Sequence, residues 1–419
     1  MRVYKFGGAS VKDANGVRNL ESIVRLAVND QSPMTNDHAL MVVVSAMGKT
    51  TNALERVVEF LDAGKEEQAL TQWVDIIDFH VRIMKELGLQ PGSDIRLQGE
   101  IPYDPALTLD QNYDQIVSLG EIMSTQIVAV YLLKQGLSVE WWNMPKLLRT
   151  DHTWREAKVD NTLSAQAIQA GWNRPGRPQI VVTQGFIGGT DDGQRTTLGR
   201  EGSDYTAALL GNYLDAQDVT IWKDVPGILN ADPRIEPNTI LIPSLRYQDA
   251  VELSYSGAQI IHPKTIRPLE NKHIPLYVKP FGDPTAGGSC ISEDGIGPIN
   301  VPVYIWRKNQ ILITMRPKDF AFVLEESLSE IFDIIHSHRL KVSLIQSSAV
   351  TISVCVDNTR FVPSAIEALQ AHFNVSYNDR LSLLTIRGTT PEILEQAKAG
   401  RTIMLSQTTR RTARLVVKE

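Results

Sequence analysis

The sequence predicts an α/β protein with an open, mostly parallel sheet covered by helices on both faces, followed by tandem α+β units. Strand–loop–helix segments repeat through the first two thirds of the chain, which is the pattern of a doubly wound sheet. The strand at residues 39–44 is apolar at every position, as in a parallel sheet that is covered on both sides. Residues 279–302 are rich in Gly and Pro and lack periodicity, and the short alternating strands beyond them indicate a different architecture.

Apolar spacing places the elements of the first part of the chain. We expect strands at residues 2–4, 39–44, 137–141, 179–184 and 218–222, and helices at residues 17–27, 52–89, 122–135 and 205–214. His80 shares a helix face with apolar residues, so we expect a packed side chain there and not a ligand. Open α/β sheets bind their ligands beyond the carboxyl ends of the strands. Functional residues are therefore expected in the loops that follow the strands.

The last part of the chain contains an internal repeat. Residues 342–348 align without gaps on residues 403–409, and the alignment continues through the next strand of each copy. The expected strands lie at 311–315, 342–345, 350–356 and 381–386, and the expected helices at 324–338, 361–373 and 391–399. The second copy stops at its last strand. We therefore expect three domains: residues 1–300, residues 301–380 and a shortened unit at residues 381–419.

Composition excludes several classes of protein. The 419 residues are too many for one core, and 42% apolar with 21% charged residues is typical of a globular protein. A net charge of −6 argues against a nucleic-acid-binding protein. No apolar run approaches the roughly 18 residues that span a bilayer, and Met1-Arg2 leads into a strand, so we expect no membrane segment, no signal peptide and a cytoplasmic location. Cys290 and Cys355 follow no metal or redox spacing.

The first loop, Lys5-Phe6-Gly7-Gly8-Ala9-Ser10-Val11, has the features of a phosphate-binding turn. Glycine lets backbone N–H groups approach an anion without a Cβ clash, and the following helix offers its N-terminus to the same charge. Lys5 supplies a full positive charge. The loop is neither a Walker P-loop nor a GxGxxG fingerprint, and paired glycines after a strand are commonly only a turn.

Two further loops carry charged side chains at strand ends. Residues 199–204 combine a guanidinium, a hydroxyl and a carboxylate, and Lys223-Asp224 precedes a second charged turn that ends at Arg234. Arg can bind a carboxylate through two parallel hydrogen bonds, and Asp204, like Glu121, can accept from an ammonium group. Considered one at a time, each acid could cap a helix, and the segment from Lys223 to Arg234 could be a charged surface turn. Because all of them follow strands of one domain, a shared site is the stronger interpretation.

With these loops in this order, the chain resembles the aspartate kinases over essentially its whole length. Residues 5–11 resemble the family's KFGGTSV signature with Ala9 in place of Thr, and residues 199–207 resemble its GRGGSDYTA loop with Glu201 in place of Gly. Residues 222–234 look like its nucleotide loop and residues 257–263 like its GAxVxHP segment. The paired C-terminal units resemble ACT domains.

The resemblance implies the amino-acid-kinase fold and the ATP-dependent phosphorylation of the L-aspartate side-chain carboxylate, the first step of lysine, threonine and methionine biosynthesis. By resemblance the catalytic residues are Lys5, Arg200 and Asp204. Aspartate would be bound by Thr51, Glu121, Arg200, Ser203 and Asp204. The nucleotide would be bound by Lys5, Gly7, Gly8, Ser10, Lys223, Asp224, Leu229, Arg234, Gln259 and Ile260. Mg²⁺ would arrive with ATP rather than in a protein-built metal site, and ACT units commonly pair, which implies a homodimer.

The departures from the family pattern raise questions of their own. Glu201 puts a charge where the family has glycine, and Gln259 stands where many members have lysine. Ser343 and Ala349 stand where lysine-sensing relatives carry acids, so we expect weak inhibition by lysine or none. Two alternatives stay open at this point: another enzyme of the amino-acid-kinase fold, such as a glutamate 5-kinase, or a ligand-sensing protein with a catalytically weak kinase domain.

Overall fold

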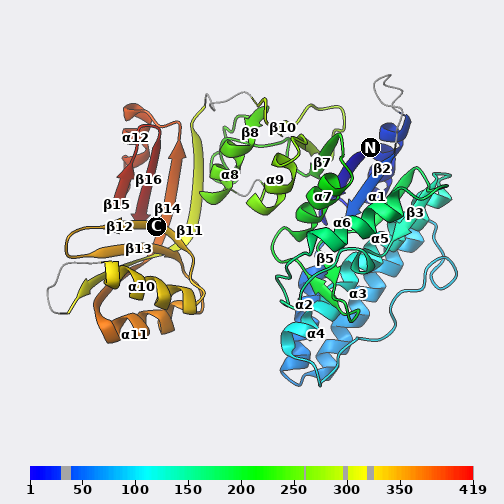
Figure 1. The fold of residues 1–419 in the computed structure, drawn as a ribbon, viewed down its shortest axis with the longest axis horizontal. Coiled ribbons are helices and arrows are strands. Elements are labelled where there is room, and N and C mark those ends of the chain that lie inside the picture. Colours follow the sequence, from blue (N-terminus) through cyan, green and yellow to red (C-terminus); the bar gives the residue numbers. More distant parts are fainter. Residues whose placement is uncertain (30–38, 259–260, 296–300, 319–324, 419) are drawn as a thin grey trace. The chain divides into compact units, whose positions relative to one another are not determined.

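The computed structural model describes residues 1–29, 39–258, 261–295, 301–318 and 325–418, and the chain divides into two compact units (Figure 1). The first unit comprises Met1–Ile228, Leu241–Val251 and Ile260–Pro298. The second comprises Leu229–Ile240, Glu252–Gln259 and Ile299–Glu419. Each unit has a large β-sheet of its own. The three domain ranges drawn from the sequence stay a prediction.

An eight-stranded sheet forms the centre of the first unit. Its order is β3-β4-β2-β1-β7-β9-β10-β8, and every neighbouring pair is parallel except β9 with β10. The strands are β1 (Arg2–Phe6), β2 (Leu40–Val44), β3 (Val139–Trp142), β4 (Ile180–Gln184), β7 (Asp218–Lys223), β8 (Ser244–Arg246), β9 (Leu276–Pro280) and β10 (Ser289–Ser292). The chain leaves β1 toward β2 on one side and returns at β7 on the other, so the end of β1 is a switch point of the kind where α/β sheets bind ligands.

Helices and one hairpin complete this unit. They are α1 (Ala14–Asn29), α2 (Thr50–Asp62), α3 (Glu66–Glu86), α4 (Leu109–Val117), α5 (Leu119–Lys134), the 3₁₀ helix η1 (Met144–Lys146), α6 (Asn161–Trp172), the hairpin β5 (Ile187–Gly189) and β6 (Arg195–Thr197), α7 (Gly202–Tyr213) and α9 (Pro263–Glu270). Helix α8 (Tyr247–Tyr255) begins in this unit, and its residues from Glu252 on belong to the second unit. All positions of β2 are buried, as its continuous apolar run predicts. The predicted fold class is confirmed.

The structure also departs from the sequence-based elements. The expected helix at 52–89 is two helices, α2 and α3, because the chain turns at Gly64 with a left-handed φ of 67°. Strands β8 and β10 have only 3 and 4 residues, too few for a periodic signal. The expectation that no apolar run reaches membrane-spanning length is wrong for Leu109–Lys134, which is long and apolar enough, although 78% of its most apolar window is buried as in a core helix.

The second unit contains a six-stranded antiparallel sheet with the order β12-β13-β11-β14-β16-β15. Its elements are β11 (Val303–Pro317), α10 (Glu325–Ser337), β12 (Val342–Ser347), β13 (Ile352–Asp357), α11 (Val362–His372), β14 (Phe373–Arg387), α12 (Pro391–Lys398), β15 (Ile403–Thr408) and β16 (Thr412–Lys418). Apolar residues of α10 and α11 pack with β11 and β13 in one core, and α12 packs with β14 and β16 in another.

The internal repeat extends to hydrogen-bond register. In the first copy Val342 pairs with Val356, and a register shift occurs before the next pair along β12. In the second copy Ile403 pairs with Val417, and a shift occurs at the same place along β15. The positions that align in the sequence therefore occupy equivalent places in two hairpins, β12–β13 and β15–β16.

Candidate active site

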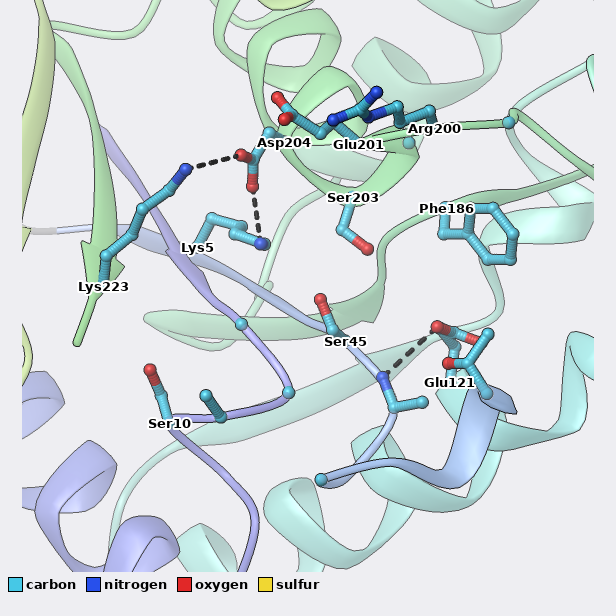
Figure 2. A pocket seen from close by; sticks show the side chains of 18 of the residues that line it. Lys5, Ser10, Ser45, Glu121, Phe186, Arg200, Glu201, Ser203, Asp204 and Lys223 are labelled. Carbon is cyan, nitrogen blue, oxygen red and sulfur yellow. Dashed lines mark hydrogen bonds and ion pairs between the residues drawn. The ribbon is translucent and has the colours of Figure 1, made fainter. Parts of the chain in front are cut away.

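A pocket of about 600 Å³ lies in the first unit at the carboxyl ends of β1, β2, β4 and β7 (Figure 2). The loops that follow these four strands and the first turn of α7 supply most of its lining. Carboxyl ends of adjacent parallel strands lie at one edge of a sheet, which explains why loops far apart in the sequence meet here. The pocket therefore occupies the switch point described above.

Two lysines flank one buried carboxylate in this pocket (Figure 2). The ammonium nitrogen of Lys5, on β1, is 2.5 Å from Asp204 Oδ1, and that of Lys223, at the end of β7, is 3.6 Å from Asp204 Oδ2. Burial alone would raise the pKa of Asp204, but the charges and hydrogen bonds of the two lysines outweigh it and hold the pKa below its ordinary value. The acid is therefore an anion that fixes two cations.

The loops after β1 and β2 touch through their backbones. The N–H of Gly48 donates to the carbonyl oxygen of Gly8 at 3.0 Å. A Cβ on Gly8 would lie 2.6 Å from the carbonyl oxygen of Ala46, so only glycine allows this approach. Ser10, in the same loop, is buried, with its hydroxyl 3.5 Å from the carbonyl oxygen of Trp222. The glycine turn is thus held rigidly against the second loop.

Glu121, in the first turn of α5, is almost fully buried at 2% exposure. Its Oε1 accepts a hydrogen bond from the N–H of Ala46 at 3.3 Å, whereas Oε2 has no hydrogen-bond partner among the described residues. Burial raises the pKa of Glu121 to about 8. A buried carboxyl oxygen without a partner beside a pocket is suited to a cationic group of a ligand.

The loop at residues 199–204 is positioned by a second buried acid, Asp114 of α4. Its carboxylate accepts hydrogen bonds from the N–H of Arg155 at 3.1 Å and from the N–H and hydroxyl of Thr197 at 3.0 and 2.7 Å. Burial raises the pKa of Asp114 to about 6. Ser203 fits because its neighbour Gly185 has no side chain, since a Cβ there would lie 2.6 Å from that of Ser203. Within the described chain, the exposed guanidinium of Arg200 has no hydrogen-bond or ion-pair partner.

Comparison with known protein families identifies the family of this chain. Residues 1–280, two thirds of the chain, match the sequence profile of the amino acid kinase family. The chain belongs to the amino acid kinase family. The glycine turn after β1, the pocket at the switch point and every strand of the eight-stranded sheet except β10 lie within the matched residues.

Several of the proteins to which this chain is similar are aspartokinases. The chain is 30% identical over 404 residues to lysine-sensitive aspartokinase 3 of Escherichia coli (strain K12), covering 92% of this chain and 86% of that protein. It is 31% identical over 372 residues to a chloroplastic aspartokinase 1 of Arabidopsis thaliana, covering 85% of this chain and 63% of that longer protein. The solved structure of E. coli aspartokinase III in complex with aspartate and ADP superposes with a TM-score of 0.83 at 28% identity, covering 100% of this chain and 96% of that one. The resemblance to aspartate kinases is confirmed.

The pocket brings together most of the residues that the family resemblance singled out. The lining includes Lys5, Gly7, Gly8, Ser10, Thr51, Glu121, Arg200, Ser203, Asp204, Lys223 and Asp224. Leu229 and Arg234 are not in the lining and belong to the second unit, where Arg234 Nη2 is 2.7 Å from Asp232. Gln259 and Ile260 lie outside the described residues. The roles of all these residues stay predictions.

Other residues that line the pocket were not predicted from the sequence. Tyr113 donates a hydrogen bond to Glu55 at 2.7 Å, and the guanidinium of Arg155 lies 4.0 Å from the Tyr113 ring centre. Nothing in the local sequence marks this group, because its members come from α2, α4 and a loop. Phe186 also lines the pocket and directly follows β4 and Gly185, so the rule that ligands bind after strand ends was sufficient to find it.

Proposed function

We propose that this amino acid kinase is an aspartate kinase, which transfers the γ-phosphoryl group of ATP to the side-chain carboxylate of L-aspartate. An oxygen of that carboxylate forms a bond to the γ-phosphorus while the bond from the same phosphorus to the β–γ bridging oxygen breaks, giving 4-phospho-L-aspartate and ADP. The attacking carboxylate is already ionised near pH 7, so the reaction needs no general base. Both reactants are anions, and the protein must therefore neutralise charge and hold them in line.

The observation that carries this proposal is the pair of lysines held on either side of Asp204 beside the glycine turn. Lys5 and Lys223 concentrate positive charge where β1 and β7 end, next to the backbone of Gly7 and Gly8. Phosphate oxygens are recognised by such N–H groups and ammonium charges. We assign the ATP phosphates to this end, with Ser10 and Asp224 beside them and Lys5 stabilising charge on the group in transfer.

The other end of the pocket suits the amino acid. Arg200 has a guanidinium free of other described partners and would grip the α-carboxylate through two hydrogen bonds. Glu121 offers an unpartnered buried oxygen to the α-ammonium. By the family resemblance Asp204, which lines the same pocket beside the two lysines, would also bind that cation. Thr51 and Ser203 would orient the reacting carboxylate with their hydroxyls.

Several finer points belong to the same proposal. Mg²⁺ would be carried in by the ATP phosphates, and the carboxylate of Asp224 at the pocket is a hard oxygen donor of the kind that Mg²⁺ prefers. Leu229, Arg234, Gln259 and Ile260 would complete the nucleotide site. We further propose a cytoplasmic homodimer that is paired through the ACT-like units.

A hydroxamate-trapping assay with ATP, Mg²⁺ and a panel of acceptors tests the proposal. Hydroxylamine converts an acyl phosphate into a stable hydroxamate, so the signal reports the carboxyl phosphate itself. We expect product with aspartate and little with glutamate. Faster turnover of glutamate would indicate a glutamate 5-kinase-like enzyme, and binding of aspartate without turnover would indicate a ligand-sensing protein.

A further inference from the structure

The side chain of Glu201 forms a hydrogen bond with the backbone of a distant segment of the chain. It immediately precedes α7, and its backbone adopts a left-handed conformation with a φ of 55°. Its side chain does not cap α7; instead Oε2 accepts a hydrogen bond from the backbone N–H of His262 at 2.7 Å. The carboxylate therefore ties the loop before α7 to a segment 61 residues later in the chain.

The backbone conformation makes this contact informative. Left-handed φ values are uncommon for side chains larger than Asn or Asp, and glycine adopts them without strain. A glutamate that stands at such a position carries strain that another interaction has to offset. Among the described residues, the side chain of Glu201 makes one such interaction, the hydrogen bond from the backbone N–H of His262.

The contact joins the starts of two packed helices. His262 is the N-cap residue of α9, and its own Nδ1 accepts from the N–H of Lys264 at 3.2 Å. Toward the other end of α9, Asn212 of α7 donates to the carbonyl oxygen of Pro268 at 2.7 Å. Helix α9 is thus fixed along α7 at both ends, and it offers Glu201 a rigid partner.

The loop that this contact holds also carries the substrate-facing side chains. Arg200 lies directly before Glu201, next to it on the turn that leads into α7, and Ser203 follows two residues later (Figure 2). A displacement at Glu201 would therefore move both neighbours together. We propose that Glu201 is a positioning residue, which aims the Arg200 guanidinium at the α-carboxylate of the acceptor by holding the His262 N–H. This inference rests on the proposed function.

Three substitutions of Glu201 test the idea by steady-state kinetics. Glu201→Ala and Glu201→Gly remove the acceptor of the hydrogen bond from the His262 N–H. Each should raise the aspartate KM roughly tenfold, because this is the loss of affinity expected when one charge-assisted hydrogen bond is removed. The ATP KM and kcat should change less than threefold. Glu201→Gln keeps an acceptor oxygen and should restore most of the affinity. Because glycine also relieves the backbone strain, a high KM in Glu201→Gly separates the lost contact from strain.

The partner N–H can be deleted as well. His262 has a φ of −68°, which proline adopts, so His262→Pro removes the donor with little change in backbone shape. His262→Ala is the matched control, because it removes the side-chain cap and keeps the N–H. We expect His262→Pro to raise the aspartate KM as Glu201→Ala does, His262→Ala to leave it near the wild-type value, and the double variant Glu201→Ala/His262→Pro to add no further loss.

The outcomes separate this inference from the proposed function. If the wild-type protein forms no aspartyl hydroxamate, the proposed function fails and this inference falls with it. If the wild type is active and Glu201→Ala keeps the wild-type aspartate KM, only the positioning role is overturned. Additive losses in the double variant, or an equal loss in His262→Ala, would also overturn it, and circular dichroism of each variant identifies any that fails to fold.

Discussion

The ammonium nitrogen of Lys5 lies 2.5 Å from Oδ1 of Asp204, and the two side chains are only 10% and 4% exposed. Removing one member of a buried ion pair leaves the other charge without its partner. Here Lys223, at 3.6 Å from the second oxygen, is still present to compensate Asp204. The fold should therefore survive the loss of Lys5 better than the chemistry does.

We accordingly predict that Lys5→Ala abolishes measurable turnover and leaves the fold intact. The lost ammonium is the group that stabilises charge on the phosphoryl in transfer, and removal of one such electrostatic contact typically costs roughly 10²–10³-fold in kcat. Hydroxamate formation and far-ultraviolet circular dichroism measure the two effects. Lys12→Ala, an exposed lysine outside the pocket lining, is the control. Full activity in Lys5→Ala would refute the assignment.

Arg200→Ala should mainly raise the aspartate KM. A bidentate ion pair that is desolvated by the bound substrate is worth about 2–4 kcal/mol, which corresponds to roughly 30- to 1000-fold in affinity. Arg200→Lys should recover only part of this, because lysine keeps the charge but not the planar pair of donors. The ATP KM is the internal control. An unchanged aspartate KM would place the α-carboxylate elsewhere.

Glu121 predicts a pH dependence of aspartate binding. Burial raises its pKa to about 8 in the empty pocket, and a bound ammonium favours the ionised acid, so binding below that pH releases a proton. Affinity should rise with pH up to about 8, by as much as roughly tenfold per unit, and then level off. Calorimetry in buffers of different ionisation enthalpy measures the proton released. Glu121→Gln should bind weakly and without this pH dependence, whereas an equal proton release in that variant would contradict the prediction.

The same shift in pKa has a consequence for stability. Because the folded-state pKa of Glu121 is above its ordinary value of 4.5, the stabilising contribution of the neutral acid is present below pH 4.5 and is lost as the pH rises through about 8. Glu121→Gln should therefore gain thermal stability relative to the wild type more at pH 9 than at pH 6. Thermal unfolding at the two pH values measures the difference, and a gain that is independent of pH would argue against a buried ionisable acid.

Local patterns predicted the parts of this protein whose physics is local. A strand followed by Gly7 and Gly8 predicts a turn that an anion can approach. The gapless repeat of residues 342–348 at residues 403–409 predicts two hairpins with the same register. No local sequence pattern predicts the contacts between loops that are far apart in the chain. Asp114 reaches Thr197 across 83 residues, and Glu201 reaches the N–H of His262 across 61, so neither partner is visible from spacing alone. From the sequence alone, the charge of Glu201 could weaken the binding of an acidic substrate or move the loop, and its hydrogen bond to His262 could not be predicted.

The two adjacent glycines of the first loop should differ sharply. A Cβ on Gly8 would lie 2.6 Å from a backbone oxygen, whereas a Cβ on Gly7 would meet only the end of the Lys5 side chain at 3.6 Å. Gly8→Ala must push the loops after β1 and β2 apart, and we expect a fall in Tm of several degrees, which corresponds to about 1–2 kcal/mol. Gly7→Ala should keep the wild-type Tm. Equal Tm values for the two variants would show that the loops are not held together at Gly8.

Lysine should inhibit this protein weakly or not at all. In the second unit, the hydroxyl of Ser343 accepts a hydrogen bond from Arg307, and Ala349 is exposed on the turn between β12 and β13. A guanidinium at Ser343 repels a second cation, and neither Ser343 nor Ala349 offers a carboxylate to the side-chain ammonium of lysine. Ser343→Asp should not create sensitivity, because Arg307 would pair with the new acid. The hydroxamate assay with lysine, threonine or methionine added measures this, and inhibition of the wild type at sub-millimolar lysine would contradict it.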